Sequence, residues 1–198
     1  MTKKQRALEI IERLKREYPD ADCTLDYEEA WKLLVSVRLA AQCTDARVNV
    51  VVQGLFAKYP DVDALAAADV DDIEQIVRPC GLGRSKARDI SACMKMLRDE
   101  YGGKVPEDFD ALLKLPGVGR KSANLIMGDV FGKPAIVTDT HCIRLSNRMG
   151  LVDGIKKRSE EGGDGIVEAD PSGRGQRFLS PSGQSWTGSM YGENEAVL

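Results

Sequence analysis

Apolar residues recur along most of the chain at the three-to-four-residue spacing that is typical of amphipathic helices. In the first segment Leu8, Ile11 and Leu14 keep this spacing with charges between them, and Pro19 ends the pattern. No segment alternates apolar and polar residues with a strand's period of two. The pattern therefore predicts an all-α fold, a multi-helix bundle with short loops. The expected helices span residues 3–18, 27–41, 44–59, 69–77, 84–101, 109–115, 120–131 and 139–149.

Two of the loops repeat each other. PCGLGRSKA at 79–87 aligns with LPGVGRKSA at 115–123 at an offset of 36, and each joins a short helix to a longer one. This arrangement predicts two helix-hairpin-helix units. In the second unit, hairpin amides and the first N–H groups of the next helix can cradle a phosphate. A tight turn that binds nothing explains the same glycines. The hairpin residues are Gly117, Val118, Gly119 and Arg120.

Composition is that of a globular domain, with 42% hydrophobic and 30% charged residues and a mean hydropathy of -0.30. No apolar run approaches membrane-spanning length, and the charged first segment does not match a secretory signal. We therefore expect a cytoplasmic protein with no membrane partner. The five cysteines are scattered and His141 is the single histidine, which favours reduced thiols and no metal site among the residues present.

Charge is unevenly distributed although the whole chain has a net charge of -3. Residues 1–77 carry 10 basic and 15 acidic side chains, residues 78–148 carry 13 and 8, and residues 149–198 carry 5 and 8. Binding of a polyanion depends on the local field, so the positive middle segment is compatible with a nucleic-acid partner. A solvated basic face without a partner is the alternative.

Two charged residues are candidates for catalysis. Lys121 lies in the first turn of a predicted helix, where the helix dipole disfavours an ammonium ion, and an unprotonated amine is what a Schiff-base nucleophile requires. Asp139 directly precedes a helix and is a natural N-cap. Beside an amine, its carboxylate could also stabilise a developing sugar cation or orient a water. The structural alternatives are a surface lysine and a cap with no further role.

The segment LPGVGRKSANLIMGDVFGKPAIVTDTHCIRLSNRMGL, residues 115–151, resembles the signature of the endonuclease III family. This family belongs to the superfamily of base-excision DNA glycosylases with a helix-hairpin-helix, a Gly/Pro-rich loop and an Asp. The lysine directly after GR, its eighteen-residue separation from the aspartate and the TDTH string all fit. LAAQCTD at 39–45 and VPEDFDALLKLPGVG at 105–119 fit as well. The resemblance covers roughly residues 3–155.

The resemblance implies a monomeric DNA glycosylase with AP lyase activity, acting on double-stranded DNA that holds an oxidised pyrimidine or an abasic site. Lys121 would attack the deoxyribose C1′, expel the base and form an imine that undergoes β-elimination. Asp139 would assist base loss, and the second hairpin would hold a phosphate. A monofunctional glycosylase and a catalytically inactive helix-hairpin-helix DNA-binding module are the alternatives.

Three further residues acquire expected roles from the same resemblance. Gln42 and Leu82 would enter the duplex and fill the space that a flipped nucleotide leaves. His141 would line the phosphate path. Simpler interpretations stand beside these: Gln42 bridges or caps helices, Leu82 is an exposed turn residue, and His141 caps its helix.

The family pattern ends within the chain. We expect an N-terminal helix at 1–22 that in the family packs on a cluster domain, and a helical domain at 23–135 whose helix-hairpin-helix spans about 109–131. The catalytic Asp loop and its helix follow at 136–155. Relatives continue with a helix and four cysteines that bind a [4Fe-4S] cluster, whereas residues 156–198 are rich in Gly and Ser and predict an irregular, disordered tail.

A shifted reading frame would account for this departure. Reading the tail from the second base of each codon fixes two amino acids. Trp186 has a single codon and every codon for Thr187 begins with A, so the shifted codon must encode Gly, and Met190 followed by Tyr191 must in the same way give Cys. These residues fall at the spacing of the family's HGRxxC segment. Our hypothesis is that residues 1–157 are authentic and the rest is an out-of-frame translation, so that the cluster is expected only if the frame is restored. Sequencing the A-run that encodes Lys156 to Arg158 decides it.

Overall fold

The computed structural model describes residues 1–20 and 23–152, and the predicted disorder and frame shift after residue 157 lie outside this part. The described residues form helices and no strand, so the all-α prediction is confirmed. The elements in chain order are α1 (Lys3–Glu17), α2 (Ala30–Ala40), α3 (Asp45–Lys58), α4 (Val62–Ala67), α5 (Val70–Val77), the 3-10 helix η1 (Arg78–Cys80), α6 (Gly83–Tyr101), α7 (Phe109–Lys114), α8 (Arg120–Asp129) and α9 (Thr140–Arg148).

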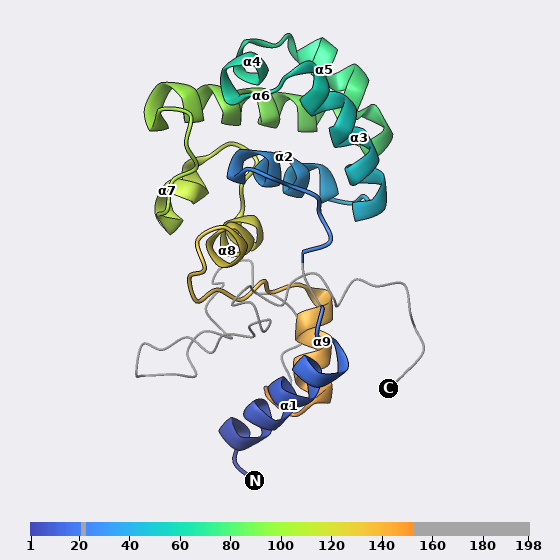
Figure 1. Cartoon of the computed structure of the whole chain (residues 1–198), viewed down its shortest axis with the longest axis vertical. Coiled ribbons are helices and arrows are strands. Elements are labelled where there is room, and N and C mark those ends of the chain that lie inside the picture. Colours follow the sequence, from blue (N-terminus) through green and yellow to red (C-terminus); the bar gives the residue numbers. More distant parts are fainter. Residues whose placement is uncertain (21–22, 153–198) are drawn as a thin grey trace.

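Helix α2 is at the centre of the main body. It lies between α6 and α8 and also contacts α3 (Figure 1). Because neighbours cover several of its faces, its sequence AWKLLVSVRLA is apolar nearly all round. Leu33 and Leu39 are completely buried and Leu34 is almost so. The two hairpins, which directly precede α6 and α8 in the sequence, are attached to this core.

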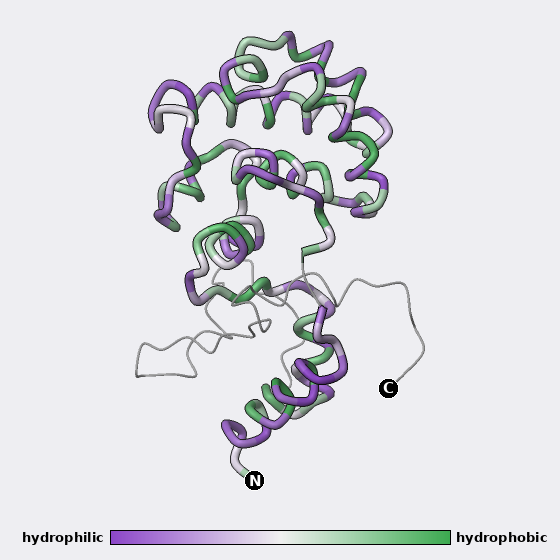
Figure 2. The backbone as a smooth tube through the Cα atoms, viewed as in Figure 1, coloured by the Kyte–Doolittle hydropathy of each residue, from purple (hydrophilic) through white to green (hydrophobic). Residues whose placement is uncertain are grey.

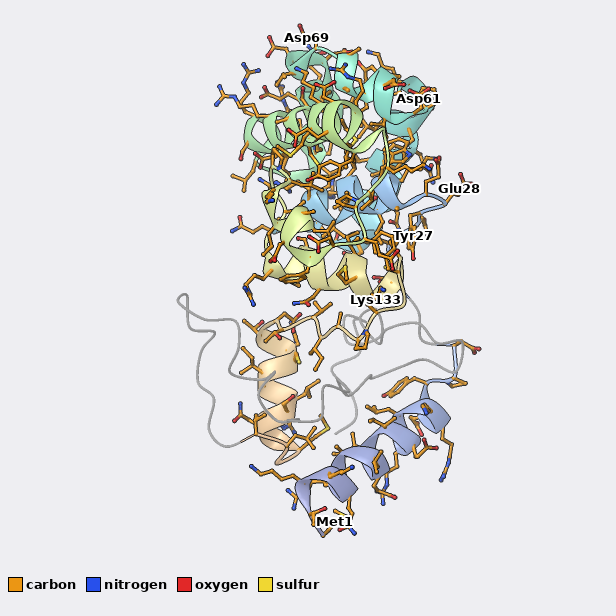
Figure 3. The ribbon with its side chains drawn as sticks, turned by 90° about the vertical axis from the view of Figure 1, so that its left-hand side faces the viewer. Met1, Tyr27, Glu28, Asp61, Asp69 and Lys133 are labelled. Atoms are coloured by element: carbon orange, nitrogen blue, oxygen red, sulfur yellow. The ribbon has the colours of Figure 1, made fainter. Side chains whose placement is uncertain are left out.

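Helices α1 and α9 lie together at one end of the molecule, away from the other helices (Figures 1 and 3). The Arg6 guanidinium donates to the Gly150 carbonyl at 3.1 Å and so ties α1 to the turn after α9. Hydrophilic and hydrophobic stretches alternate along α1 (Figure 2), as its amphipathic pattern predicts. Leu8 on this helix is 54% exposed.

Apart from one-residue shifts at helix ends, the structure differs from the predicted helices in four places, one of them the 3-10 helix η1, which was not predicted. Helix α2 begins at Ala30 rather than residue 27, and α8 ends at Asp129 rather than residue 131. Helix α4 was not predicted. Its start is stabilised by the Asp61 carboxylate, which accepts from the Ala64 N–H. None of the helices in residues 1–20 and 23–152 is both long and apolar enough to cross a bilayer.

Candidate active site

Lys121 and Asp139 lie close together although eighteen residues separate them in the sequence. The Lys121 Nζ is 3.8 Å from the Asp139 Oδ2. Lys121 is the second residue of α8, and Asp139 is the residue that caps α9. The lysine side chain is 43% exposed and the aspartate side chain 13%. The amine can therefore be reached from solvent, while the carboxylate is largely sheltered behind it.

The carboxylate of Asp139 has two separate contacts. Its Oδ1 accepts a hydrogen bond of 2.7 Å from the Cys142 N–H in the first turn of α9, which confirms the predicted N-cap. Its Oδ2 is the oxygen nearest to the Lys121 amine. Because the cap fixes the side chain, the second oxygen is held toward the amine before any ligand binds.

The second hairpin lies directly before Lys121. Gly117 has a φ of +78°, and the Val118 N–H donates to the Leu115 carbonyl at 3.1 Å to close the turn. Gly119 caps α8 without a side-chain hydrogen bond, and no acidic residue lies in the first turn of that helix. The exposed turn and the amine therefore share the positive end of α8, where an anion binds favourably. The guanidinium carbon Cζ of Arg120 lies over the Phe109 ring, 5.5 Å from the ring centre.

An ion pair supports this hairpin from behind. The Arg38 Nε donates to the Asp89 Oδ2 at 2.7 Å. A Cβ at Gly117 would lie 2.9 Å from the Arg38 Cδ and 2.9 Å from the Asp89 Cβ, so only glycine fits this approach. Sequence reasoning missed both supporting residues, because they come from α2 and α6 and no motif joins them.

Gln42 and Leu82 share an unusual backbone conformation. Their φ angles are +58° and +51°, and no other non-glycine residue in the described part of the chain has a positive φ. Both are exposed, Leu82 to 59%. A left-handed conformation costs about 1–2 kcal/mol for a residue with a Cβ, and such strain is concentrated at functional sites. Their expected entry into DNA stays a prediction.

His141 is half-buried in the first turn of α9, with its Nδ1 3.3 Å from the Arg144 Nη2. Asp139 supplies the cap of this helix, so the alternative in which His141 caps it is wrong. The phosphate-lining role of His141 stays a prediction.

The described residues do not fit an iron–sulfur cluster. All five cysteines of the chain lie in the described part, and no three potential metal ligands gather there. Burial raises the pKa of Cys80 to about 11 and that of Cys93 to about 12, and thiols of this kind are poor ligands because they resist deprotonation. Cys80 and Cys93 are small residues of the buried hydrophobic core.

A family model described as HhH-GPD superfamily base excision DNA repair protein matches residues 35–163. Endonuclease III of Synechocystis sp. is 48% identical over 151 residues, which cover 76% of this chain and 69% of that protein. Endonuclease III of Bacillus subtilis is 43% identical over 141 residues, 71% of this chain and 64% of that protein.

Solved structures agree with the sequence relatives. A non-covalent endonuclease III–DNA complex superposes with a TM-score of 0.74 at 39% identity, covering 84% of this chain and 82% of that one. A trapped endonuclease III–DNA covalent intermediate gives a TM-score of 0.73 with the same identity and coverage. The chain is thus a helix-hairpin-helix protein of the base-excision type. It belongs to the HhH-GPD superfamily of base excision DNA repair proteins, and endonuclease III is the member that it resembles in both comparisons.

Proposed function

We propose that the chain is a DNA glycosylase with associated AP lyase activity. The observation that carries the proposal is the 3.8 Å separation of the Lys121 Nζ and the Asp139 Oδ2 beside an exposed anion-binding turn. The relatives support it, because they are endonuclease III proteins and one of the solved structures is a covalent intermediate on DNA. A reversible amine nucleophile explains both a base-release step and a strand-cleavage step.

In the proposed reaction the lone pair of the Lys121 amine forms a bond to C1′ of the damaged nucleotide. The bond from C1′ to the base breaks, and its electron pair leaves with the base, which takes up a proton. The C1′–O4′ bond of the sugar ring then breaks, O4′ takes up the proton that the nitrogen loses, and an imine forms between C1′ and the Lys121 Nζ. Removal of a proton from C2′ then expels the 3′ phosphate by β-elimination. Asp139 accepts the proton of the attacking amine and stabilises positive charge at the sugar.

The remaining site residues bind and distort the DNA. The hairpin of Gly117, Val118 and Gly119 binds a phosphate beside the lesion through its exposed amides, while the Val118 N–H closes the turn, and Arg120 adds a charge-assisted contact. Stacked DNA hides C1′ and the base edge, so the nucleotide must leave the helix at a cost of a few kcal/mol. Gln42 and Leu82 offset part of this cost by filling the vacated space. The seventh expected contact, His141, would line the phosphate path.

The preferred substrate class is an oxidised pyrimidine in double-stranded DNA, read by a monomer in the bacterial cytoplasm. We also propose the division of the chain at residues 22, 135 and 155 that the sequence suggested. A [4Fe-4S] cluster is expected only if the C-terminal frame is restored.

Borohydride trapping tests the proposal. On a duplex with one abasic site the native chain is expected to give a reduced covalent adduct, and Lys121→Gln is expected to give none. Lys104→Gln, which changes an exposed lysine in the loop before α7, is the matched control and keeps the adduct. Salt-sensitive binding of the native chain without an adduct would instead identify an inactive DNA-binding module. Release of the base from a duplex with an oxidised pyrimidine, without an adduct on either duplex, would identify a monofunctional glycosylase.

A further inference from the structure

Lys86 is a completely buried lysine in α6, with 0% of its surface exposed. Its Nζ donates to the Leu39 carbonyl at 2.8 Å and to the Cys80 carbonyl at 2.7 Å. Leu39 lies in the last turn of α2, and Cys80 is the last residue of η1. Each carbonyl therefore belongs to the helix end that leads into one of the two exposed turns, the one with Gln42 and the one with Leu82.

The backbone of Lys86 makes a third contact with the same region. Its N–H donates to the Leu82 carbonyl at 3.0 Å. Lys86 therefore contacts the Leu82 turn at two points. Its side-chain ammonium donates to the Cys80 carbonyl before Leu82, and its backbone N–H donates to the carbonyl of Leu82 itself. The Gln42 turn is joined to this assembly through the Leu39 carbonyl, three residues earlier.

The two turns need such support because both are strained. Gln42 and Leu82 hold a left-handed backbone although each has a Cβ, and this conformation persists only where the surrounding structure enforces it. Short local bonds close each turn: the Cys43 N–H donates to the Ala40 carbonyl, and the Gly81 N–H donates to the Arg78 carbonyl. The Lys86 ammonium connects one turn with the other through two hydrogen bonds, next to a side-chain hydrogen bond between Cys43 and Cys80.

A lysine at this position is costly for stability. Burial is the main influence on its pKa and lowers it, and the ionisable groups around it are Arg38, Cys43 and Cys80. The carbonyl ends of α2 and η1 offset part of the desolvation, because they carry the negative ends of the helix dipoles. An apolar side chain would fill the volume without this cost. The hydrogen bonds to the two turns are what a lysine adds.

Lys86 and Lys121 occupy neighbouring positions of the repeated hairpin and differ in burial. At the offset of 36, Ser85–Lys86 in the first hairpin aligns with Lys121–Ser122 in the second. Moving a side chain by one position rotates it by about 100° around the helix. The lysine of the first hairpin is accordingly buried, whereas the side chain of Lys121 is 43% exposed.

We propose that Lys86 is a positioning residue that locks the Gln42 and Leu82 turns into one rigid unit, so that both side chains enter the duplex together. The inference rests on the proposed function of these two turns. It predicts that loss of the ammonium weakens extrusion of a paired nucleotide and spares the chemistry at Lys121.

Two DNA substrates separate positioning from chemistry. One is a fully paired duplex with an oxidised pyrimidine, and the other carries an abasic site inside a short unpaired bubble, where no pair has to be opened. Lys86→Met is expected to slow base excision from the paired duplex about tenfold or more, and to leave the borohydride adduct rate on the bubble within about twofold. Lys95→Met, an exposed lysine on the same helix, is the matched control and changes neither rate.

A double-mutant cycle with Leu82→Ala gives a second measurement. If Lys86 acts through the turn, Lys86→Met costs less in the Leu82→Ala background than in the native one. If Lys86→Met does not fold, Lys86→Gln, which keeps donor hydrogens, replaces it in both experiments. Equal losses on paired and bubble DNA, no loss on either, or additive effects in the cycle overturn the proposal. Absence of an adduct from the native chain on both DNAs contradicts the proposed function instead.

Discussion

At the residue scale, the Asp139 carboxylate has both a structural role and a proposed chemical one. Asp139 binds the Cys142 N–H with one oxygen and approaches the Lys121 amine with the other. The sequence could predict the cap, because an Asp directly before an amphipathic segment is a recognised helix start. It could not predict the 3.8 Å approach to Lys121 from the residues alone, since that distance depends on the path of the loop between α8 and α9.

Two substitutions at Asp139 are expected to separate its roles. Asparagine caps a helix about as well as aspartate but carries no charge. We expect Asp139→Asn to keep the melting temperature and to slow base release about 100-fold, as loss of acid–base assistance does. Asp139→Ala should slow base release similarly and also lower the free energy of unfolding by about 1 kcal/mol. Single-turnover excision and thermal unfolding measure the two effects, and an unchanged excision rate in Asp139→Asn would refute the catalytic role.

At the scale of elements, the repeated helix-hairpin-helix unit was visible in the sequence because glycines at a constant offset mark both turns. What lies behind each turn was not visible. Arg38 and Asp89 support the second hairpin, and Lys86 supports the first. Charged residues in amphipathic helices are ordinarily assigned to the solvent face, so their inward contacts emerge only from packing.

The second hairpin is expected to tolerate no side chain at Gly117. Its φ of +78° and the 2.9 Å approach of Arg38 and Asp89 both oppose a Cβ, so Gly117→Ala should reduce the free energy of unfolding by about 1–3 kcal/mol. It should also weaken binding to abasic DNA. Gly54→Ala is the control: this glycine is exposed within α3 and has no atom within 4 Å of an added Cβ. It should stabilise the chain by about 0.5–1 kcal/mol. Chemical denaturation compares them, and equal stability of the two variants contradicts the account.

The whole molecule shows where sequence reasoning succeeds and where it stops. The long helices were predicted because their periods are clear, while the short elements α4 and η1 were not predicted. The left-handed backbone of Gln42 and Leu82 was also hidden, because neither is a residue type that favours it. Overall acidity proved a weak guide: a chain with a net charge of -3 belongs to a family of DNA repair proteins.

Mapping the covalent attachment site tests the central claim most directly. After borohydride reduction on an abasic duplex, the chain is digested with trypsin and the modified peptide is sequenced by mass spectrometry. We predict one deoxyribose adduct on the first residue of the peptide 121–144, uncut after Lys121 because the modified lysine resists trypsin and uncut after Lys133 because Pro134 follows. An adduct carried by Lys133, by another lysine or by the N-terminal amine would contradict the assignment of Lys121 as the nucleophile.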